Sequence, residues 1–172
     1  MTTMKCLYLL RHAKSSWKDR GLADHDRPLA GRGRRAADAI AGHLREQSIE
    51  PELVLCSTAR RARETLERIE SALGTPGVRI EPELYRATAS ELLERLRTVP
   101  EGAGSVMLIG HNPGLELLAL DLARPSPRLR ELEVKYPTTA LATLAFPGPS
   151  WRELDHGTAE LIGFVRPRDL EQ

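Results

Sequence analysis

The stretch CLYLLRHAK, residues 6–14, runs from almost entirely apolar side chains directly into Arg11, His12 and Lys14, with no turn residue between them. Residues 5–10 do not alternate between apolar and polar types, which predicts a strand covered on both faces. Such a strand belongs in the interior of a sheet flanked by helices. The purpose of its polar tip depends on which other residues reach the same edge of that sheet.

The composition is that of an ordinary globular chain. Its 172 residues, 41% hydrophobic and 28% charged, fit a single domain over residues 1–172. The net charge of +1 and the 4% of aromatic residues argue against a nucleic-acid partner. No apolar run reaches the ~20 residues of a membrane span, so we expect no membrane partner, and the N-terminus reads as a strand rather than a signal peptide. Cys6 and Cys56 lie in apolar strand-like runs, which favours free thiols and a cytoplasmic location.

Apolar runs of strand length recur along the chain, at 51–57, 78–84 and 105–110, with three more in the tail at 140–148, 150–154 and 158–165. Between them, apolar residues at three- and four-residue spacing predict helices over 34–44, 62–73, around 92–96 and over 113–122. This alternation predicts a three-layer α/β/α sandwich with a mostly parallel central sheet and antiparallel pairing at one edge. Asn112 is expected to cap the last helix, with Pro113 as its first residue.

Sites in open α/β sheets form beyond the carboxyl ends of the strands. The first strand ends in Arg11 and His12, the second leads into the arginine-rich segment STARRA (57–62), and the fourth leads through GHNPG (110–114) to His111. We therefore expect two imidazoles and at least two guanidiniums to meet at one edge, where they could bind an anion.

The three arginines at 60, 61 and 63 are not equivalent. Arg60 and Arg63 each precede a glutamate by four residues and can form exposed pairs on a helix surface. Arg61 precedes Thr65 instead and flanks the apolar line of the helix, so it is the arginine we expect at the site. Three further histidines lie in polar surroundings where we expect no role: His25, His43 and His156.

Two histidines and two arginines suit phosphoryl transfer. Arginine matches phosphoryl oxygens and stays charged, and a neutral imidazole can attack phosphorus and carry the group covalently. A cysteine phosphatase is excluded because the sixth residue after Cys56 is Ala62, and no glycine lies between them. A metal site is not predicted, since no third ligand stands near either histidine at metal-binding spacing.

The motifs LLRHAKSSW (9–17), STARRARET (57–65) and GHNPG, with DRPLAGRG (26–33) and KYPTTALATLAF (135–146), resemble the histidine phosphatase superfamily. The short chain is similar to its SixA-type branch of small phosphohistidine phosphatases, which implies a phosphoglycerate mutase-like fold and no cofactor. The resemblance implies that His12 is the phosphorylated nucleophile and that Arg11 and Arg61 bind the phosphoryl group. It implies that His111 is the second catalytic histidine.

Three positions bear on how far the resemblance extends. Thr58 replaces the proline usual in the second motif, which we expect to affect only the start of the helix, and Ala13 stands where larger relatives have glycine. Larger relatives carry a glutamate after the third strand as general acid; here Glu83 is the nearest candidate, with Glu81 or no acid as alternatives. Because a protonated phosphohistidine nitrogen leaves readily, weak acid assistance suffices.

The connections between strands are short, and the longest, 113–140, is expected to hold one helix. An open pocket suits a phosphate displayed on a protein surface, so the expected substrate is phosphohistidine in a carrier domain. A phosphomonoesterase acting on a small phosphorylated metabolite is the alternative within enzymes. A phosphate-binding module without turnover is the alternative outside them.

Overall fold

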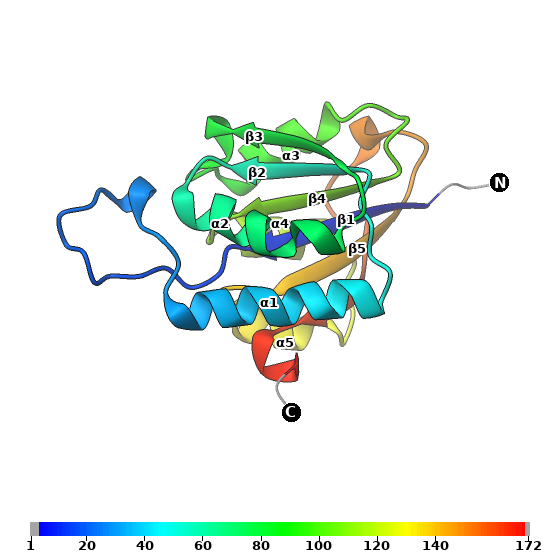
Figure 1. The fold of residues 1–172 in the computed structure, drawn as a ribbon. Coiled ribbons are helices and arrows are strands. Elements are labelled where there is room, and N and C mark those ends of the chain that lie inside the picture. Colours follow the sequence, from blue (N-terminus) through cyan, green and yellow to red (C-terminus); the bar gives the residue numbers. More distant parts are fainter. Residues whose placement is uncertain (1–3, 171–172) are drawn as a thin grey trace.

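The computed structural model describes residues 4–170 and is built around one six-stranded sheet (Figure 1). The strands are β1 (Met4–Arg11), β2 (Leu53–Ser57), β3 (Gly77–Glu81), β4 (Ser105–Gly110), β5 (Leu141–Pro147) and β6 (Glu160–Val165). Their order is β3-β2-β4-β1-β5-β6, in which β1 to β4 run parallel and β5 and β6 are antiparallel to their neighbours. The predicted sandwich with an antiparallel edge is confirmed.

Helices cover both faces of the sheet. On one face lie α1 (Gly31–Glu46) and α2 (Arg60–Ile69); on the other lie α3 (Ala89–Arg97), α4 (Gly114–Leu122) and α5 (Leu129–Val134). Single turns of 3-10 helix occur at Asp24–Asp26, Glu70–Ala72, Pro82–Leu84, Trp151–Glu153 and Pro167–Leu170. In the described part of the chain, no helix is both long enough and apolar enough to cross a bilayer.

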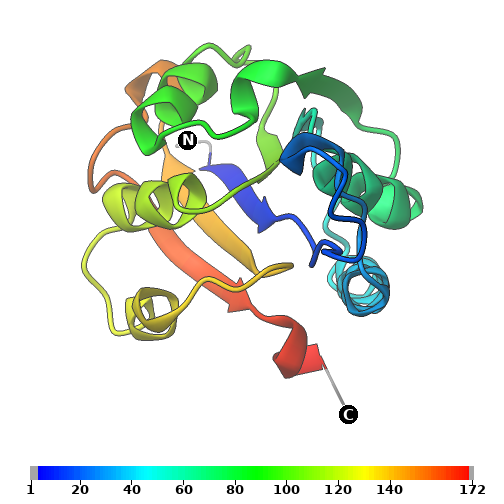
Figure 2. The same ribbon diagram turned by 90° about the vertical axis from the view of Figure 1, so that its left-hand side faces the viewer.

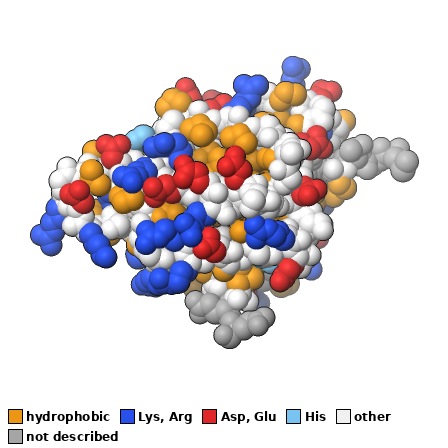
Figure 3. All heavy atoms as spheres, viewed as in Figure 1, with side chains coloured by type: hydrophobic (Ala, Val, Ile, Leu, Met, Phe, Trp, Pro, Cys, Tyr) orange, Lys and Arg blue, Asp and Glu red, His pale blue; other side chains and the backbone are white. Residues whose placement is uncertain are grey.

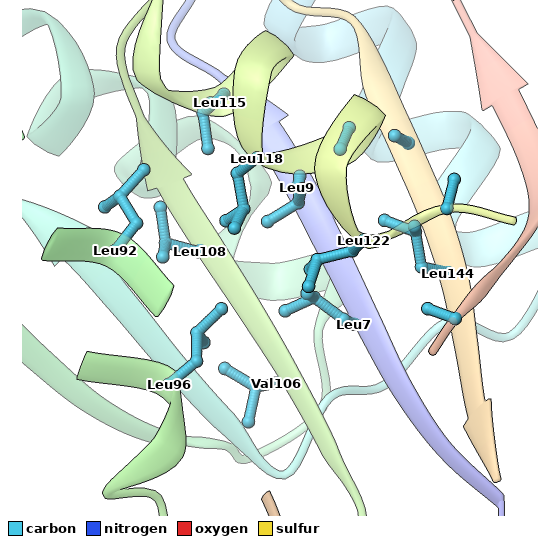
Figure 4. Packing of buried hydrophobic residues seen from close by; sticks show 14 of the residues in the cluster. Leu7, Leu9, Leu92, Leu96, Val106, Leu108, Leu115, Leu118, Leu122 and Leu144 are labelled. Carbon is cyan, nitrogen blue, oxygen red and sulfur yellow. The ribbon is translucent and has the colours of Figure 1, made fainter. Parts of the chain in front are cut away.

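The central strands contribute side chains to a core on each side. On β4, Val106 and Leu108 pack with α3 and α4, where Figure 4 shows them pointing toward Leu92, Leu96 and Leu118. The alternate residues of β4, Met107 and Ile109, join the core under α1 and α2. All four β4 side chains have no exposed surface, which explains why the sequence of the strand is apolar without alternation.

One predicted strand is absent from the described structure. Residues 150–154 form a 3-10 turn at Trp151–Glu153 and join no sheet. Trp151 is fully buried and its Nε1 donates to the main-chain oxygen of Ala103 at 2.7 Å. The prediction was wrong because the apolar residues here anchor the connection between β5 and β6 rather than pair with a neighbouring strand.

Two predictions for residues 112–140 were also wrong. The helix α4 begins at Gly114, one residue later than expected, so Pro113 occupies the cap position. The side chain of Asn112 still accepts from the main-chain nitrogen of Glu116 in the first turn, at 3.3 Å, and it donates to the main-chain oxygen of Tyr136 at 3.0 Å. The side chain of Asn112 thereby ties the start of α4 to the segment before β5. The segment also holds two helices rather than one. The second helix, α5, was missed because it buries only Leu129 and Leu132, too few apolar residues to show a helical period in the sequence.

Candidate active site

The polar tips of three strands meet at the carboxyl edge of the sheet. β1 and β4 end level with each other, with Arg11 paired to Gly110 in the parallel register. The main-chain nitrogen of His12 donates to the oxygen of Gly110 at 3.0 Å, which sets the first histidine beside the strand that leads to His111. Figure 2 looks onto this edge, where the β1–α1 loop and the segment after β3 flank the end of β1.

His12 is held in one protonation and tautomeric state. Its ring is buried, with 7% exposed, and Nδ1 contacts the main-chain oxygen of Ala13 at 2.7 Å. Because that oxygen only accepts, Nδ1 carries the proton and Nε2 keeps a lone pair. Burial, with smaller contributions from nearby positive charge, lowers the pKa of His12 to about 3. The imidazole is therefore neutral at physiological pH.

His111 lies beside His12, with 5.1 Å between the ring centroids. Its Nε2 is 2.7 Å from Ser57 Oγ at the end of β2, and Nδ1 is buried with no hydrogen-bond partner among the described residues. Burial, followed by the charge of Arg61, lowers the pKa of His111 to about 4, so this ring is neutral as well.

Two guanidiniums accompany the histidines. Arg11 donates from Nη1 to the main-chain oxygen of Tyr136 at 2.9 Å, and its charge lowers the pKa of both His12 and His111. Arg61, in the first turn of α2, is 8% exposed and places Nε 3.4 Å from His12 Nε2. The structure thus brings together Arg11, His12, Arg61 and His111, the four residues expected to meet.

The neighbours of Arg61 in sequence lie elsewhere. Arg60 forms the expected exposed pair with Glu64 at 3.1 Å. Arg63 differs from the expectation, because its Nε donates to the main-chain oxygen of Thr58 at 2.9 Å. The side chain of Arg61 alone turns inward, since the α2 face that carries it packs on the sheet.

Sequence reasoning missed two side chains at this edge, Asp24 and Tyr85. Asp24 accepts from Arg61 Nη2 at 3.1 Å and from the Tyr85 hydroxyl at 2.5 Å. The Tyr85 ring packs edge-on against His111, with centroids 5.5 Å apart. The turn-rich DHDRPL segment and the short 3-10 turn before Tyr85 have no periodicity that could have pointed to them.

His25, for which we expect no role, lies close to the site. Its ring packs edge-on against Tyr85 with centroids 4.8 Å apart, and Nε2 is 2.8 Å from Thr58 Oγ1. Thr58, in place of the usual proline, thus supplies a hydroxyl that fixes the β1–α1 loop to the start of α2.

The two glutamates considered as general acid are not brought to the histidines. Glu83 is exposed, and among the described residues no hydrogen bond or ion pair joins it to His12 or His111. Glu81 is engaged by Arg95 through two hydrogen bonds of 2.7 and 2.9 Å, which hold the pKa of the Glu81 carboxyl below its usual value.

A cavity of about 400 Å³ opens next to the histidines. Its lining consists of Asp24, Arg61, His111 and Leu117 with residues 86–89 and 112–114, so His111 borders it directly and His12 lies behind Arg61. No group of three or more His, Cys, Asp or Glu side chains within residues 4–170 is arranged as a metal site. The arrangement offers converging cations to an oxyanion and a neutral imidazole to its central atom.

Comparison with known proteins agrees with this geometry. The family model for the histidine phosphatase superfamily (branch 1) matches residues 7–86. An uncharacterized protein of Mycobacterium tuberculosis is 38% identical over 163 residues, covering 92% of this chain and 100% of that protein. Phosphohistidine phosphatase SixA of Escherichia coli is 31% identical over 121 residues, covering 67% of this chain and 73% of that one.

A solved structure gives the same result for the fold. The putative phosphohistidine phosphatase SixA from Nakamurella multipartitia is 33% identical and superposes with a TM-score of 0.80, covering 95% of this chain and 96% of that one. With the motif order, the strand-end geometry and these relatives in agreement, the chain belongs to the histidine phosphatase superfamily, in its SixA-type branch.

Proposed function

We propose that this protein is a metal-independent phosphatase that works through a phosphohistidine intermediate on His12, and that its substrate is phosphohistidine in a protein. The observation that carries the proposal is the state of His12. The ring is neutral, its Nδ1 proton is held by the Ala13 carbonyl, and in the described part of the chain its Nε2 lone pair meets only Arg61 Nε, in a long hydrogen bond of 3.4 Å that an incoming phosphoryl group would replace. An imidazole in that state is a nucleophile at physiological pH.

The first step transfers the phosphoryl group to the enzyme. His12 Nε2 forms a bond to phosphorus as the bond from phosphorus to the substrate nitrogen breaks. That nitrogen leaves with the bonding electron pair, and because the other ring nitrogen of the substrate imidazole carries a proton, the imidazole departs neutral. Negative charge spread over the equatorial oxygens is stabilised by Arg11 and Arg61, with His111 as a neutral donor. In the second step water attacks the phosphohistidine, releasing inorganic phosphate and restoring neutral His12.

No side chain need act as a strong acid in this scheme. An imidazole whose second ring nitrogen is protonated leaves as a neutral molecule and is a good leaving group, whereas an alkoxide is not. This supports a phosphohistidine substrate over an alkyl phosphate, since Glu81 is occupied by Arg95 and no hydrogen bond or ion pair among the described residues joins Glu83 to the histidines. The name of the Escherichia coli relative, phosphohistidine phosphatase, supports the same substrate. The free thiols of Cys6 and Cys56 support a reducing, cytoplasmic location.

The test is to trap the intermediate and locate it. Protein mixed with a phosphodonor and quenched at alkaline pH should carry one acid-labile phosphoryl group, which peptide mass spectrometry should place on His12. His12→Ala should lose the label and the turnover of an aryl phosphate. His156→Ala is the matched control, because His156 is exposed and pairs with Asp121 away from the site.

Substrate class is decided by comparing turnover. A phosphorylated histidine-containing carrier domain should be hydrolysed with a higher kcat/KM than any member of a panel of sugar and nucleotide phosphates. The reverse order would assign the protein to small metabolites. Binding of phosphate without turnover of any substrate would leave only a phosphate-binding role, and label on another side chain would overturn the assignment of His12.

A further inference from the structure

We propose that Asp24 is a positioning residue for phosphoryl binding: it holds the Arg61 guanidinium beside His12 so that the arginine meets the incoming phosphoryl oxygens. The inference rests on the proposed function for the role of Arg61. It assigns a role to a residue in the β1–α1 loop, 37 positions away from Arg61 in the chain.

Asp24 grips Arg61 at two points. Arg61 Nη1 donates to the main-chain oxygen of Asp24 at 2.8 Å, and Nη2 donates to its Oδ2 at 3.1 Å. The third nitrogen, Nε, faces His12 Nε2 at 3.4 Å. With all three nitrogens engaged, the plane of the guanidinium is fixed, while three of the five N–H bonds are used and one on each Nη is left for an anion.

Asp24 is itself held from two sides. The hydroxyl of Tyr85 donates to its Oδ2 at 2.5 Å, and Arg27 Nη1 donates to its Oδ1 at 3.1 Å. Arg27 is 5% exposed and also donates from Nε to the main-chain oxygen of Ser16 at 3.1 Å, which ties both ends of the loop together. These hydrogen bonds fix the position of the Asp24 carboxylate within the β1–α1 loop.

A carboxylate at an anion site would by itself oppose phosphate. Here its charge is shared by Arg61, by Arg27 and by Arg86 at 3.7 Å. The Tyr85 and Arg61 hydrogen bonds hold the pKa of Asp24 well below its usual range, so its charge is constant wherever the enzyme is assayed. Asp24 could affect phosphate affinity in two opposite ways. It could raise the affinity by orienting Arg61 toward the phosphoryl oxygens (the supporting role), or lower it by holding Arg61 away from them (the blocking role). Arg61 Nε contacts His12 while Nη1 and Nη2 hold Asp24, so Asp24 keeps the guanidinium at the histidine. This favours the supporting role.

The test measures binding of inorganic vanadate by calorimetry. Asp24→Asn keeps the main-chain contact and the size of the side chain but removes its charge, and Asp24→Ala removes both side-chain oxygens. We expect the vanadate Kd to rise by about ten- to hundredfold for Asp24→Ala, the effect of losing a hydrogen bond between charged groups, and by less for Asp24→Asn.

A merely structural loop residue is distinguished by two further measurements. In a double-mutant cycle, Asp24→Ala with Arg61→Ala should bind vanadate no more weakly than Arg61→Ala alone, because Asp24 acts through Arg61. Tyr85→Phe, which loosens Asp24 without touching Arg61, should weaken binding in the same direction. Asp38→Asn is the matched control, because Asp38 pairs with Arg68 through two hydrogen bonds on the exposed surface of α1 and α2. Figure 3 shows that acidic and basic side chains are interspersed on this face.

The outcomes separate the inference from the proposed function. Unchanged or tighter vanadate binding by Asp24→Asn, at an unchanged melting temperature, would overturn the positioning role; tighter binding would indicate that Asp24 holds Arg61 away from phosphate. Additive losses in the double variant would overturn it too, by making Asp24 act independently of Arg61. If Arg61→Ala itself binds vanadate normally, the proposed phosphoryl site fails and the inference with it.

Discussion

Two buried neutral histidines should make this protein unusually sensitive to mild acid. Both rings titrate far below the value of about 6.5 that histidine has in an unfolded chain, with pKa values of about 3 for His12 and about 4 for His111. Between these values and 6.5 the unfolded state binds protons that the folded state does not, so the free energy of unfolding falls as pH falls. Each histidine then contributes a slope of about 1.4 kcal/mol per pH unit.

The expected size of the effect follows from the same values. Lowering the pH from 7 to 5 takes each unfolded imidazole from mostly neutral to almost fully protonated while the folded rings stay neutral. Over that interval each histidine should lower the free energy of unfolding by about 2 kcal/mol, and the pair should lower it by about 4 kcal/mol. This is a large fraction of the stability of a small domain. Asp24 does not affect this measurement. Its pKa in the folded state lies below the 3.8 of an unfolded aspartate, so its contribution to the free energy of unfolding is lost only below about pH 4, outside the interval from pH 7 to 5.

Urea unfolding at pH 7, 6 and 5, followed by far-ultraviolet circular dichroism, measures the slope directly. His12→Gln should lose about half of the decline and the double variant with His111→Gln nearly all of it. His156→Gln serves as the control: Asp121 raises the pKa of this exposed histidine, so its charge favours folding at low pH and its removal should not flatten the curve. Equal free energies of unfolding at pH 7 and pH 5 in the unmodified protein would refute the burial argument, as would an undiminished slope in the double variant.

Two further predictions concern packing and catalysis. A methyl group at Gly33 would lie 2.1 Å from the main-chain oxygen of Lys14, two residues after His12, so Gly33→Ala should lower the free energy of unfolding by about 1–3 kcal/mol in urea. Gly42→Ala, in the same helix with nothing within 4 Å, should instead gain up to about 1 kcal/mol, and equal effects at both sites would contradict the clash. Glu83→Gln should keep kcat and KM for phosphohistidine substrate, because Glu83 is exposed and no hydrogen bond or ion pair within residues 4–170 joins it to the histidines; a large fall in kcat would restore it as the acid.

The strands and most of the candidate site could be predicted because both follow from local signals. A strand buried on both faces must be apolar throughout, and 105–110 shows this directly. Arg11, His12 and His111 stand one or two residues beyond such runs, so the parallel register alone brings them to one edge. Arg61 was separable from Arg60 because it precedes Thr65 by four residues and flanks the apolar line of the helix, which forms the buried face, whereas Arg60 precedes Glu64 on the exposed face.

The residues that escaped prediction are held by contacts between distant segments. Asp24 meets Arg61 and Tyr85 across 37 and 61 positions of sequence, from a loop and a single 3-10 turn that carry no period. Trp151 was misassigned for a related reason, since its partner Ala103 lies 48 positions away and its burial resembles that of a strand residue. Such contacts are fixed only when the whole fold is in place.

The chemistry of the site and its cost to stability have the same cause. A nucleophilic imidazole must be neutral and a phosphoryl site must be positive, and each condition reinforces the other: Arg61 and Arg11 lower the pKa of His12, and its neutral ring adds no charge to repel them. The same burial makes protonation expensive, so the fold loses free energy of unfolding in mild acid to keep the lone pair available. Asp24 acts against this trend, because its charge raises the pKa of His111 while its hydrogen bonds aim Arg61. The charge of Asp24 raises the pKa of His111 and is not among the causes of the His12 shift, so Asp24 can hold the arginine without favouring protonation of the proposed nucleophile.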